Sequence, residues 1–337
     1  MSWDRSAPPG DIEVLPHPTV LGYSSDESLK YGQLHLTCSS ESDATDGACP
    51  AEGTTQLSSL PGTVVLEAKE RRSGLTTRFS ARAWLSRAMD NARVCGSYWL
   101  TVTRPFNTAI GDLCAGYWSV GTGASLIIPA HELDRLVAGQ WTATLVLRLH
   151  AEQKGAPIAD YTFNFDFTIT DHNAVSIYFP AFPNVSPLVA LNAGYDPISQ
   201  TIGGRTGLDM CLYDGLGSQA QYLGVTVRDT GTRPPGPSGF SLWHDTAGND
   251  DSQRLDYTVT LDHNGTTVPL TNGVEEQLHG IDTAQLRLVM LPGMSQPVFC
   301  VPTPMTLDIP RVPVSTKRSG IYWGDLKVEL RVPTATP

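Results

Sequence analysis

Two stretches of alternating apolar and polar residues place the strongest limit on how this chain can fold. Residues 141–150 put Trp141 and four further apolar side chains on one face, and residues 161–170 do the same with Phe163, Phe165, Phe167 and Ile169. A period of two is typical of a strand with one buried face, whereas an amphipathic helix repeats about every 3.6 residues. The two stretches, joined by an exposed tip, therefore predict a β-hairpin. Similar runs recur about every 10 to 15 residues, so the sequence predicts an all-β protein.

The length and composition indicate two domains. The chain has 337 residues with 31 glycines and 25 prolines, which supply the turns that many short strands need. A new series of strand-like runs begins at about residue 176. We therefore expect an N-terminal domain over residues 1–172, a short joint over 173–175 and a C-terminal domain over 176–337. Both are predicted to be immunoglobulin-like β-sandwiches, and the short joint suggests that they lie end to end.

Four local patterns give further expectations. Residues 128–139 predict one short helix in this chain, with Pro129 near its start and a glycine at its end. The sequence Gly-Gly-Arg-Thr-Gly at 203–207 predicts a turn, and Asp-His-Asn-Gly at 262–265 predicts a hairpin turn. The prolines within residues 1–18 predict an arm or an edge strand, because proline cannot donate a hydrogen bond to a sheet.

The cysteines indicate export to an oxidising compartment. Their even number, without a Cys-x-x-Cys pair, favours disulfides over zinc, although buried free thiols in a cytosolic protein are the alternative. The N-terminal residues lack the apolar core of a signal peptide, so export rests on the cysteines. Six cysteines allow fifteen pairings. Sequence proximity favours Cys38–Cys49 and Cys95–Cys114, which leaves Cys211–Cys300.

No pattern in the sequence supports catalysis. His131-Glu132 begins like a zinc-protease motif, but Arg135 stands where the second histidine should be, so a solvated helix face is the preferred interpretation. The net charge of −11 argues against a nucleic-acid partner, and no run of apolar residues is long enough to span a membrane. We expect no enzyme, no catalytic residues, no metal and no cofactor.

One local charge excess suggests an anionic ligand. Residues 69–93 hold seven basic side chains against two acidic ones, which could form a basic strip that attracts a sialylated glycan or a sulfated surface. The alternative is a set of ordinary solvated strand faces. The basic residues are Lys69, Arg71, Arg72, Arg78, Arg82, Arg87 and Arg93.

The alternation at residues 324–333 raises a separate question. The apolar positions Leu326, Val328, Leu330 and Val332 alternate with charged ones, which predicts a strand with one buried face. No further strand-like run follows it in this sequence. We therefore expect a strand whose open edge and apolar face need cover from elsewhere.

Four stretches together resemble the CblD family, whose members are minor tip subunits of class 5, or alpha-class, chaperone–usher fimbriae and include CfaE-type adhesins. The resemblance runs in collinear order over most of the chain, and its motifs are CSSESDATDGACP (38–50), IPAHELDRLVAGQW (128–141), LDMCLYDG (208–215) and GIYWGDLKVELRV (320–332).

The resemblance implies an N-terminal adhesin domain and a C-terminal pilin domain that lacks its last strand. It implies export through the periplasm, display at a fimbrial tip, and the cysteine pairing given above. A periplasmic chaperone and then the major pilin would supply the missing strand at the outer-membrane usher, against a groove formed by Leu326, Val328, Leu330 and Val332.

The resemblance also suggests receptor-binding residues. Exposed arginines of the adhesin domain bind the host in this family, and residues 70–74 (ERRSG) match well, so Arg71 and Arg72 are candidates. Lys154 is a further candidate, although this chain has Gln153-Lys154 where relatives carry tandem basic residues.

The sequence thus predicts a fimbrial tip adhesin that binds a host-cell glycan or glycoprotein and initiates pilus assembly. A periplasmic pilus chaperone, which also has two immunoglobulin-like domains, and a secreted carbohydrate-active enzyme are the alternatives. Glycan binding would distinguish an adhesin from a chaperone, and turnover of a bound glycan would favour an enzyme.

Overall fold

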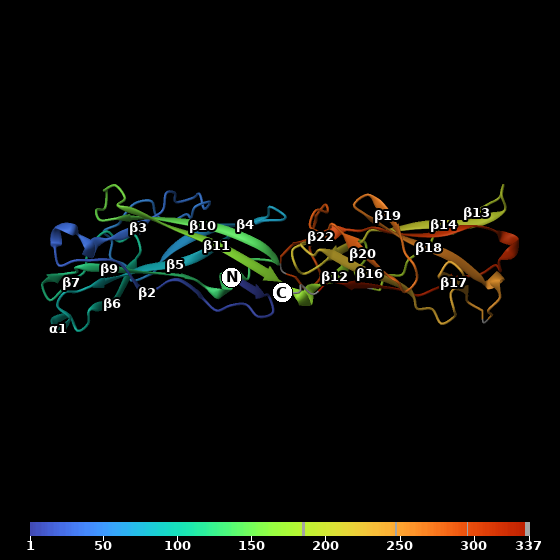
Figure 1. Cartoon of the computed structure of the whole chain (residues 1–337), viewed down its shortest axis with the longest axis horizontal. Coiled ribbons are helices and arrows are strands. Elements are labelled where there is room, and N and C mark those ends of the chain that lie inside the picture. The colour runs from blue at the N-terminus through green and yellow to red at the C-terminus, as the bar shows by residue number, and fades with distance from the viewer. Residues whose placement is uncertain (184–185, 247, 295, 334–337) are drawn as a thin grey trace. The chain divides into compact units, whose positions relative to one another are not determined.

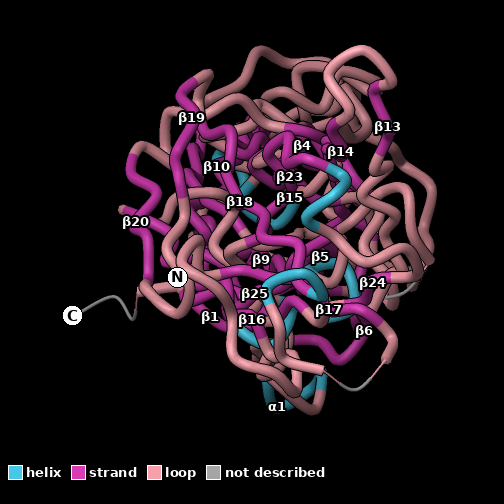
Figure 2. The backbone as a smooth tube through the Cα atoms, turned by 90° about the vertical axis from the view of Figure 1, so that its right-hand side faces the viewer, coloured by secondary structure: helices cyan, strands magenta, loops and turns pink. Residues whose placement is uncertain are grey.

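The computed structural model describes residues 1–183, 186–246, 248–294 and 296–333 (Figure 1). The chain divides into two compact units, Met1–Thr170 (unit 1) and Asp171–Pro337 (unit 2), and each is described by itself. Strands and loops make up most of the backbone, and the helices are short (Figure 2). The all-β fold predicted from the alternating runs is therefore confirmed.

Unit 1 is built on one sheet of nine strands and a separate small hairpin of β7 and β8. The order along the sheet is β1-β11-β10-β4-β5-β9-β2, while β3 pairs with β10 and β6 pairs with β5. The strands are β1 (Ser2–Asp4), β2 (Ile12–Tyr23), β3 (His35–Thr37), β4 (Gly62–Glu70), β5 (Thr76–Ala88), β6 (Trp99–Pro105), β7 (Leu113–Cys114), β8 (Tyr117–Trp118), β9 (Gly121–Ile128), β10 (Gly139–His150) and β11 (Ala159–Thr170).

The hairpin of β10 and β11 supplies much of the core of unit 1. Trp141 lies opposite Phe167 and Leu145 lies opposite Phe163 in the antiparallel register, as the period of two predicts. Trp141 and Leu145 are both fully buried. Removing each large apolar side chain from water contributes about 1.5–3 kcal/mol, so this face is a major stabilising feature of the unit.

The first 23 residues form both edges of the unit 1 sheet. Strand β1 lies parallel to β11 at one end of the sheet, and β2 lies antiparallel to β9 at the other. The pairing of β2 shifts register between Leu15 and Thr19, the interval that contains Pro16 and Pro18. Prolines are tolerated at such irregular edge positions because no ladder hydrogen bond is required of them. The expectation of an arm or an edge is confirmed.

The helices of unit 1 differ from the prediction. The helix expected over residues 128–139 is wrong in length, since α2 covers Ala130–Leu133 only. The next apolar residues, Leu136 to Ala138, are buried one after another, and the Trp141 indole donates a hydrogen bond to the Val137 carbonyl oxygen at 2.8 Å. A second helix, α1 (Ala92–Cys95), was not predicted. Short 3₁₀ turns are η1 (Glu27–Leu29), η2 (Tyr31–Gln33) and, in unit 2, η3 (His172–Ala174), η4 (Asp251–Gln253) and η5 (Val314–Thr316).

The described residues of unit 2 form three sheets whose inner faces share one apolar core. Their orders are β12-β15-β22-β21, β13-β14-β23-β18-β17-β24 with β19 on β18, and β20-β16-β25. The strands are β12 (Ser176–Tyr178), β13 (Gly194–Asp196), β14 (Thr201–Leu208), β15 (Cys211–Tyr213), β16 (Tyr222–Asp229), β17 (Phe240–His244), β18 (Arg254–His263), β19 (Thr266–Pro269), β20 (Glu275–His279), β21 (Arg287–Val289), β22 (Val298–Pro302), β23 (Met305–Pro313), β24 (Tyr322–Trp323) and β25 (Leu326–Arg331).

Two turns predicted in unit 2 have different outcomes. The hairpin turn at 262–265 is confirmed, because Asn264 and Gly265 connect β18 to β19 with φ values of 52° and 74°. The turn predicted at 203–207 is wrong, because these residues lie within β14 and pair with β23. A Cβ atom on Gly204 would lie 2.6 Å from the Leu191 carbonyl oxygen. This glycine therefore permits a close backbone approach rather than a turn.

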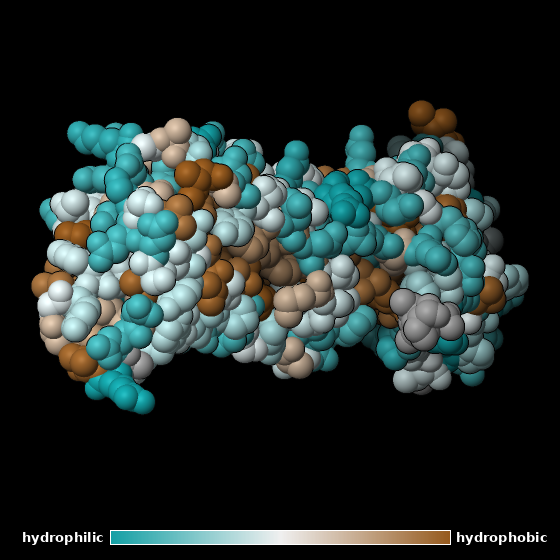
Figure 3. Space-filling view, turned by 60° about the vertical axis from the view of Figure 1, so that its left-hand side comes forward, coloured by the Kyte–Doolittle hydropathy of each residue, from teal (hydrophilic) through white to brown (hydrophobic). Residues whose placement is uncertain are grey.

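The surfaces of the strands follow the alternation in the sequence. On the face shown in Figure 3, apolar residues occur in small groups separated by polar ones. This is the surface expected of antiparallel sheets that bury one face and expose the other to water.

Candidate functional site

Strand β25 lies at the open edge of its sheet. It pairs with β16 in an antiparallel register from Leu326 opposite Asp229 to Arg331 opposite Gly224. Within the residues that the structure describes, β25 pairs with no other strand. One row of its backbone N–H and C=O groups therefore has no ladder partner, and such an edge can accept another strand.

The apolar face of this segment is only partly covered. Its neighbours on β16, Val225 and Val227, are completely buried. The four residues predicted to form a groove lie together here, half-buried and packed against the core of unit 2: Leu326, Val328, Leu330 and Val332. The core beneath β25 is thus covered on the β16 side and less completely on the open side.

The charged side chains on the opposite face of β25 form ion pairs. Glu329 pairs with Arg228 of β16 at 3.0 Å and with Lys327 at 2.8 Å, and both partners lower the pKa of its carboxylate. Arg331 pairs with Glu275 of β20 and lies over the ring of Tyr222. Of these exposed pairs, Glu329 with Arg228 joins β25 to β16. The charged face of β25 thus has partners, and the incomplete part of the strand is its free edge and apolar face.

A second segment covers the same core without belonging to a strand. Residues 186–193 form no regular structure, yet Val189 and Leu191 are half-buried and pack against the core cluster of unit 2. The Thr206 hydroxyl of β14 donates to the Ala190 carbonyl oxygen at 2.8 Å and fixes this segment. Both β25 and residues 186–193 therefore contribute partly covered apolar side chains to one core.

The predicted receptor-binding arginines lie in the turn between β4 and β5. The Arg71 side chain is 60% exposed and pairs with Asp166 of β11 at 3.4 Å. It also donates a hydrogen bond to the Gln140 side-chain oxygen at 3.3 Å, while Arg72 is half-buried. Arg71 is thus accessible, but it lies beside Asp166 of β11 and Gln140 at the start of β10.

Lys154 lies at the opposite end of unit 1. It is exposed on the loop between β10 and β11, whereas the Arg71 turn lies beside the first residues of β10 (Figure 1). Strand β10 has 12 residues, and each strand residue advances about 3.3 Å, so roughly 35 Å separates the two places. The structure does not bring Lys154 together with Arg71 and Arg72.

Arg87 corrects the prediction of a basic strip over residues 69–93. Its side chain is completely buried, so it cannot contribute to a surface strip. The guanidinium donates hydrogen bonds to four oxygens from distant segments, and desolvation lowers its pKa to about 10. The acceptors are the carbonyl oxygens of Leu34, Thr108 and Ile110 at 2.6–2.7 Å and the Thr122 hydroxyl at 2.5 Å.

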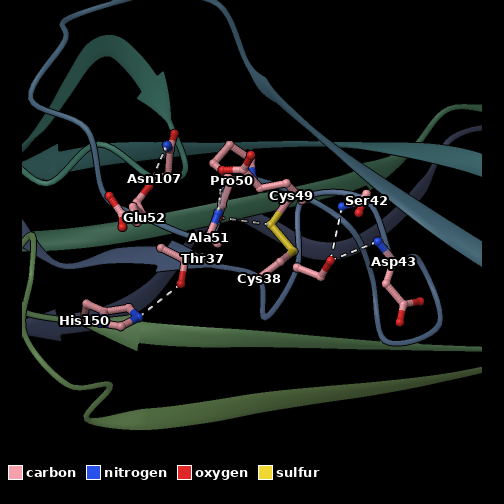
Figure 4. Close-up of a disulfide and its surroundings, with 12 residues drawn as sticks. Thr37, Cys38, Ser42, Asp43, Cys49, Pro50, Ala51, Glu52, Asn107 and His150 are labelled. Carbon is pink, nitrogen blue, oxygen red and sulfur yellow. Dashed lines mark hydrogen bonds between the residues drawn. A yellow bond between two sulfur atoms is a disulfide. The ribbon is translucent and has the colours of Figure 1, made fainter.

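Three disulfides join the cysteines in the two pairs that proximity favours and in the third pair that remains. They are Cys38–Cys49, Cys95–Cys114 and Cys211–Cys300, and no cysteine among the described residues is free. Figure 4 shows Cys38–Cys49 with the hydrogen bond between the Thr37 hydroxyl and His150 Nε2 at 3.1 Å. The loop closed by Cys38–Cys49 is therefore attached to the end of β10 that leads into the loop with Lys154.

The described residues show neither a metal site nor a membrane helix. None of their His, Cys, Asp and Glu side chains form a group of three or more that could hold a metal ion. None of their helices has the length and apolar character needed to cross a bilayer.

Comparisons with known proteins account for both units. The profile for the first domain of CfaE, the E subunit of CFA/I fimbriae, matches residues 1–172, and that for its second domain matches residues 175–334. The chain belongs to the CfaE family of fimbrial subunits. The E subunit of CFA/I fimbriae from Escherichia coli is 28% identical over 314 residues, which cover 88% of this chain and 80% of that protein.

Solved structures of this family share the fold. The crystal structure of CfaE, described as the adhesive subunit of CFA/I fimbria of enterotoxigenic Escherichia coli, has a TM-score of 0.76 at 24% identity and covers 100% of this chain and 93% of that one. A structure described as a chaperone–tip adhesin complex has a TM-score of 0.71 at 25% identity, with coverage of 99% and 95%. The predicted CfaE-like resemblance and two-sandwich fold are confirmed.

Membership of the CfaE family settles the broad class of this protein. It is a fimbrial subunit, which implies a surface location on a fimbria, and its family is one of adhesin subunits rather than enzymes. The roles of the open edge in unit 2 and of the basic residues in unit 1 are separate questions.

Proposed function

We propose that this subunit is a fimbrial tip adhesin whose unit 2 accepts a donor strand from the major pilin and whose unit 1 binds a host receptor. The observation that carries the proposal is β25, an edge strand with a half-buried apolar face. A strand added at this edge would pair with the free backbone groups of β25. Its alternate side chains would cover Leu326, Val328, Leu330 and Val332.

The same edge explains the need for assembly partners. An unpaired edge above an incompletely covered core invites aggregation, so the subunit needs temporary cover before it meets a pilin. A periplasmic chaperone would supply the first strand and the outer-membrane usher would host its exchange for the pilin strand. The similar structure described as a chaperone–tip adhesin complex supports the chaperone step.

The first two strands of unit 1 are not free to act as donor strands. Residues 2–4 and 12–23 are built into unit 1 as β1 and β2. A shaft subunit must donate a strand to its neighbour, whereas a tip subunit needs only to receive one. Residues already paired within their own sheet are not free to be donated.

For the receptor we propose a host-cell glycan or glycoprotein bound by unit 1. Arg71 with Arg72, and separately Lys154, are the proposed contacts, because all three are accessible or partly accessible cations. The length of β10 separates them, so one small glycan would engage either the arginines or the lysine.

Matched variants of the full chain test this proposal. We would compare the adherence to host cells of a double variant, Arg71→Ala with Arg72→Ala, of Lys154→Ala, and of Arg93→Ala, an exposed arginine of the same basic group. Loss of adherence in the double variant alone or in Lys154→Ala alone, with weaker binding at high salt, would assign the receptor contact to that end. Unchanged adherence in both would remove the basic residues from the receptor site. Absence of adherence by the unaltered chain would contradict the adhesin function.

A further inference from the structure

A hollow of about 350 Å³ lies in unit 1 at the end that carries the β10–β11 loop. Its walls come from residues 24–33, from Ile110 and from Trp118 to Val120. Lys30 in this wall forms an ion pair with Glu152 of the β10–β11 loop, which places the hollow beside Lys154. A volume of this size is within the range of small-molecule sites.

Trp118 gives the hollow an exposed aromatic surface. This large side chain is 52% exposed, although it lies on β8 next to a disulfide-bonded strand, β7. An indole ring offers a broad, rigid apolar face at a small cost in conformational entropy. Such a face suits a ligand that is apolar on one side and polar at its rim.

Acidic groups supply acceptors around this ring. The Asp26 carboxylate accepts hydrogen bonds from the backbone N–H of Ser28 at 3.0 Å and from its hydroxyl at 2.7 Å, which orient it and lower its pKa. The Glu27 carboxylate has no hydrogen bond or ion pair among the described residues. The one cation of the wall, Lys30, is already paired with Glu152, so the hollow is acidic overall.

A buried polar network holds the walls in place. Arg87 binds the carbonyl oxygens of Leu34 and Ile110, and the Thr122 hydroxyl donates to the Tyr31 carbonyl oxygen at 2.7 Å. A Cβ atom on Gly32 would lie 1.7 Å from the Ser119 carbonyl oxygen, so these two wall segments touch through their backbones. Walls fixed in this way lose little freedom when a ligand binds.

We propose that this hollow binds one neutral pyranose unit of the receptor glycan. A pyranose ring has a face of C–H groups that can stack on Trp118 and hydroxyl groups that can donate to Asp26 and Glu27. The carboxylates would repel sialic acid and sulfated sugars. The inference rests on the adhesin function proposed above, and it adds an aromatic and acidic subsite at the end of unit 1 that also carries Lys154.

The decisive comparison is Trp118→Ala against Tyr117→Ala in the full chain. The two aromatic residues are adjacent on β8 and equally exposed at 52%, but Tyr117 does not line the hollow. Binding would be measured on arrays of neutral oligosaccharides and their sialylated counterparts. We expect Trp118→Ala to weaken binding to the neutral glycans at least about tenfold and Tyr117→Ala to change it less than about twofold.

A second variant tests the acceptors. Glu27→Gln keeps the shape of the side chain, and we expect it to weaken neutral-glycan binding and to reduce the discrimination against sialylated counterparts. Equal binding by Trp118→Ala and the unaltered chain, or preference of the unaltered chain for sialylated glycans, would overturn the inference. Host-cell adherence measured in parallel separates the two proposals. Adherence retained by Trp118→Ala leaves the adhesin function intact, whereas an unaltered chain that does not adhere contradicts both.

Discussion

The last strands of the two units have different surroundings. Strand β11 of unit 1 has a partner on each side, β10 on one and the short N-terminal β1 on the other. Strand β25 of unit 2 has β16 on one side and, among the described residues, no partner on the other. Unit 1 thus flanks its last strand with residues of its own, whereas the last strand of unit 2 lies at an edge of its sheet.

Strand β11 itself shows what a partner strand does to apolar side chains. Ile169 lies in the part that pairs with β1, and Phe167 lies just before it and packs against Trp3 of β1; they are only 1% and 2% exposed. Phe163 and Phe165 share their face but lie beyond the end of β1, and they are half-buried. The side chains of β25 resemble this second group. Beside β1, where the Trp3 ring packs against Phe167, this row of β11 is buried, and beyond β1 it is only partly covered.

The largest effect should come from giving unit 2 the strand that it lacks. Fusion of a major-pilin N-terminal peptide through a short linker after Pro337 should raise the melting temperature of unit 2 by more than about 10 °C. Burying four or five large side chains contributes about 1.5–3 kcal/mol each before the cost of ordering the peptide. Differential scanning calorimetry would measure the shift.

The control for this fusion is Leu330→Asp in the same chain. A carboxylate in the groove should abolish the gain and also prevent capture by the chaperone, because a charge cannot be buried there without a partner. If the chains with and without the peptide melt at the same temperature, unit 2 is already complete and the difference between β11 and β25 has no functional meaning.

Patterns within single strands made much of this fold predictable. The alternation in residues 141–150, 161–170 and 326–332 is a property of each segment alone, so it predicted β10, β11 and β25 directly. Strand β14 was missed because its glycines carry no pattern of side chains. Its place depends on pairing with β23 and on the segment that packs against Gly204. The helix α2 was overestimated because the residues after it join the core one after another.

The candidate sites also differ in how far the sequence alone could predict them. The four apolar residues of the open edge alternate along one short segment, Leu326 to Val332, so the sequence could group them. The separation of Arg71 from Lys154 depends on which strands pair, and the burial of Arg87 depends on acceptors at residues 34, 108, 110 and 122. The hollow beside Trp118 likewise joins three segments, and no local signal could have indicated it.

A second prediction concerns a substitution that lowers the stability of unit 1 and leaves unit 2 unchanged. Arg87→Met should destabilise unit 1 by about 3–5 kcal/mol, because it leaves buried oxygens without their donor. Arg82→Met, at an exposed position of the same strand, should cost less than about 0.5 kcal/mol. Calorimetry should show the unit 1 transition alone moving, with the response of unit 2 to the donor peptide unchanged. Equal effects of the two variants would contradict the structural role of Arg87.

A third prediction uses pH to distinguish the units. His35 is completely buried in unit 1, and burial, with the nearby charges of His150 and Arg87, lowers its pKa from 6.5 to about 4. The unfolded chain then binds a proton more readily than the folded one. Stability of unit 1 should therefore be highest above pH 6.5 and fall by about 2–3 kcal/mol as the pH decreases to 4. His35→Gln should flatten this part of the curve of stability against pH. If the curves of His35→Gln and the unaltered chain run parallel, another group is responsible.

The smallest effect should come from the strand that closes unit 1. The Trp3 ring of β1 packs against Phe167 at a centroid distance of 5.4 Å, so Trp3→Ala would uncover part of β11 while leaving the backbone pairing in place. Because Trp3 is only half-buried, we expect a loss of about 1–2 kcal/mol in unit 1. The control is Trp323→Ala, an exposed tryptophan of unit 2, which should cost less than about 0.5 kcal/mol. Trp3→Ala should also bind more of a dye that recognises exposed apolar surface, because the apolar face of β11 would then be as incompletely covered as that of β25. If both variants are as stable as the unaltered chain, backbone pairing rather than side-chain cover closes the edge of unit 1, and a donor strand for β25 would then need few apolar residues.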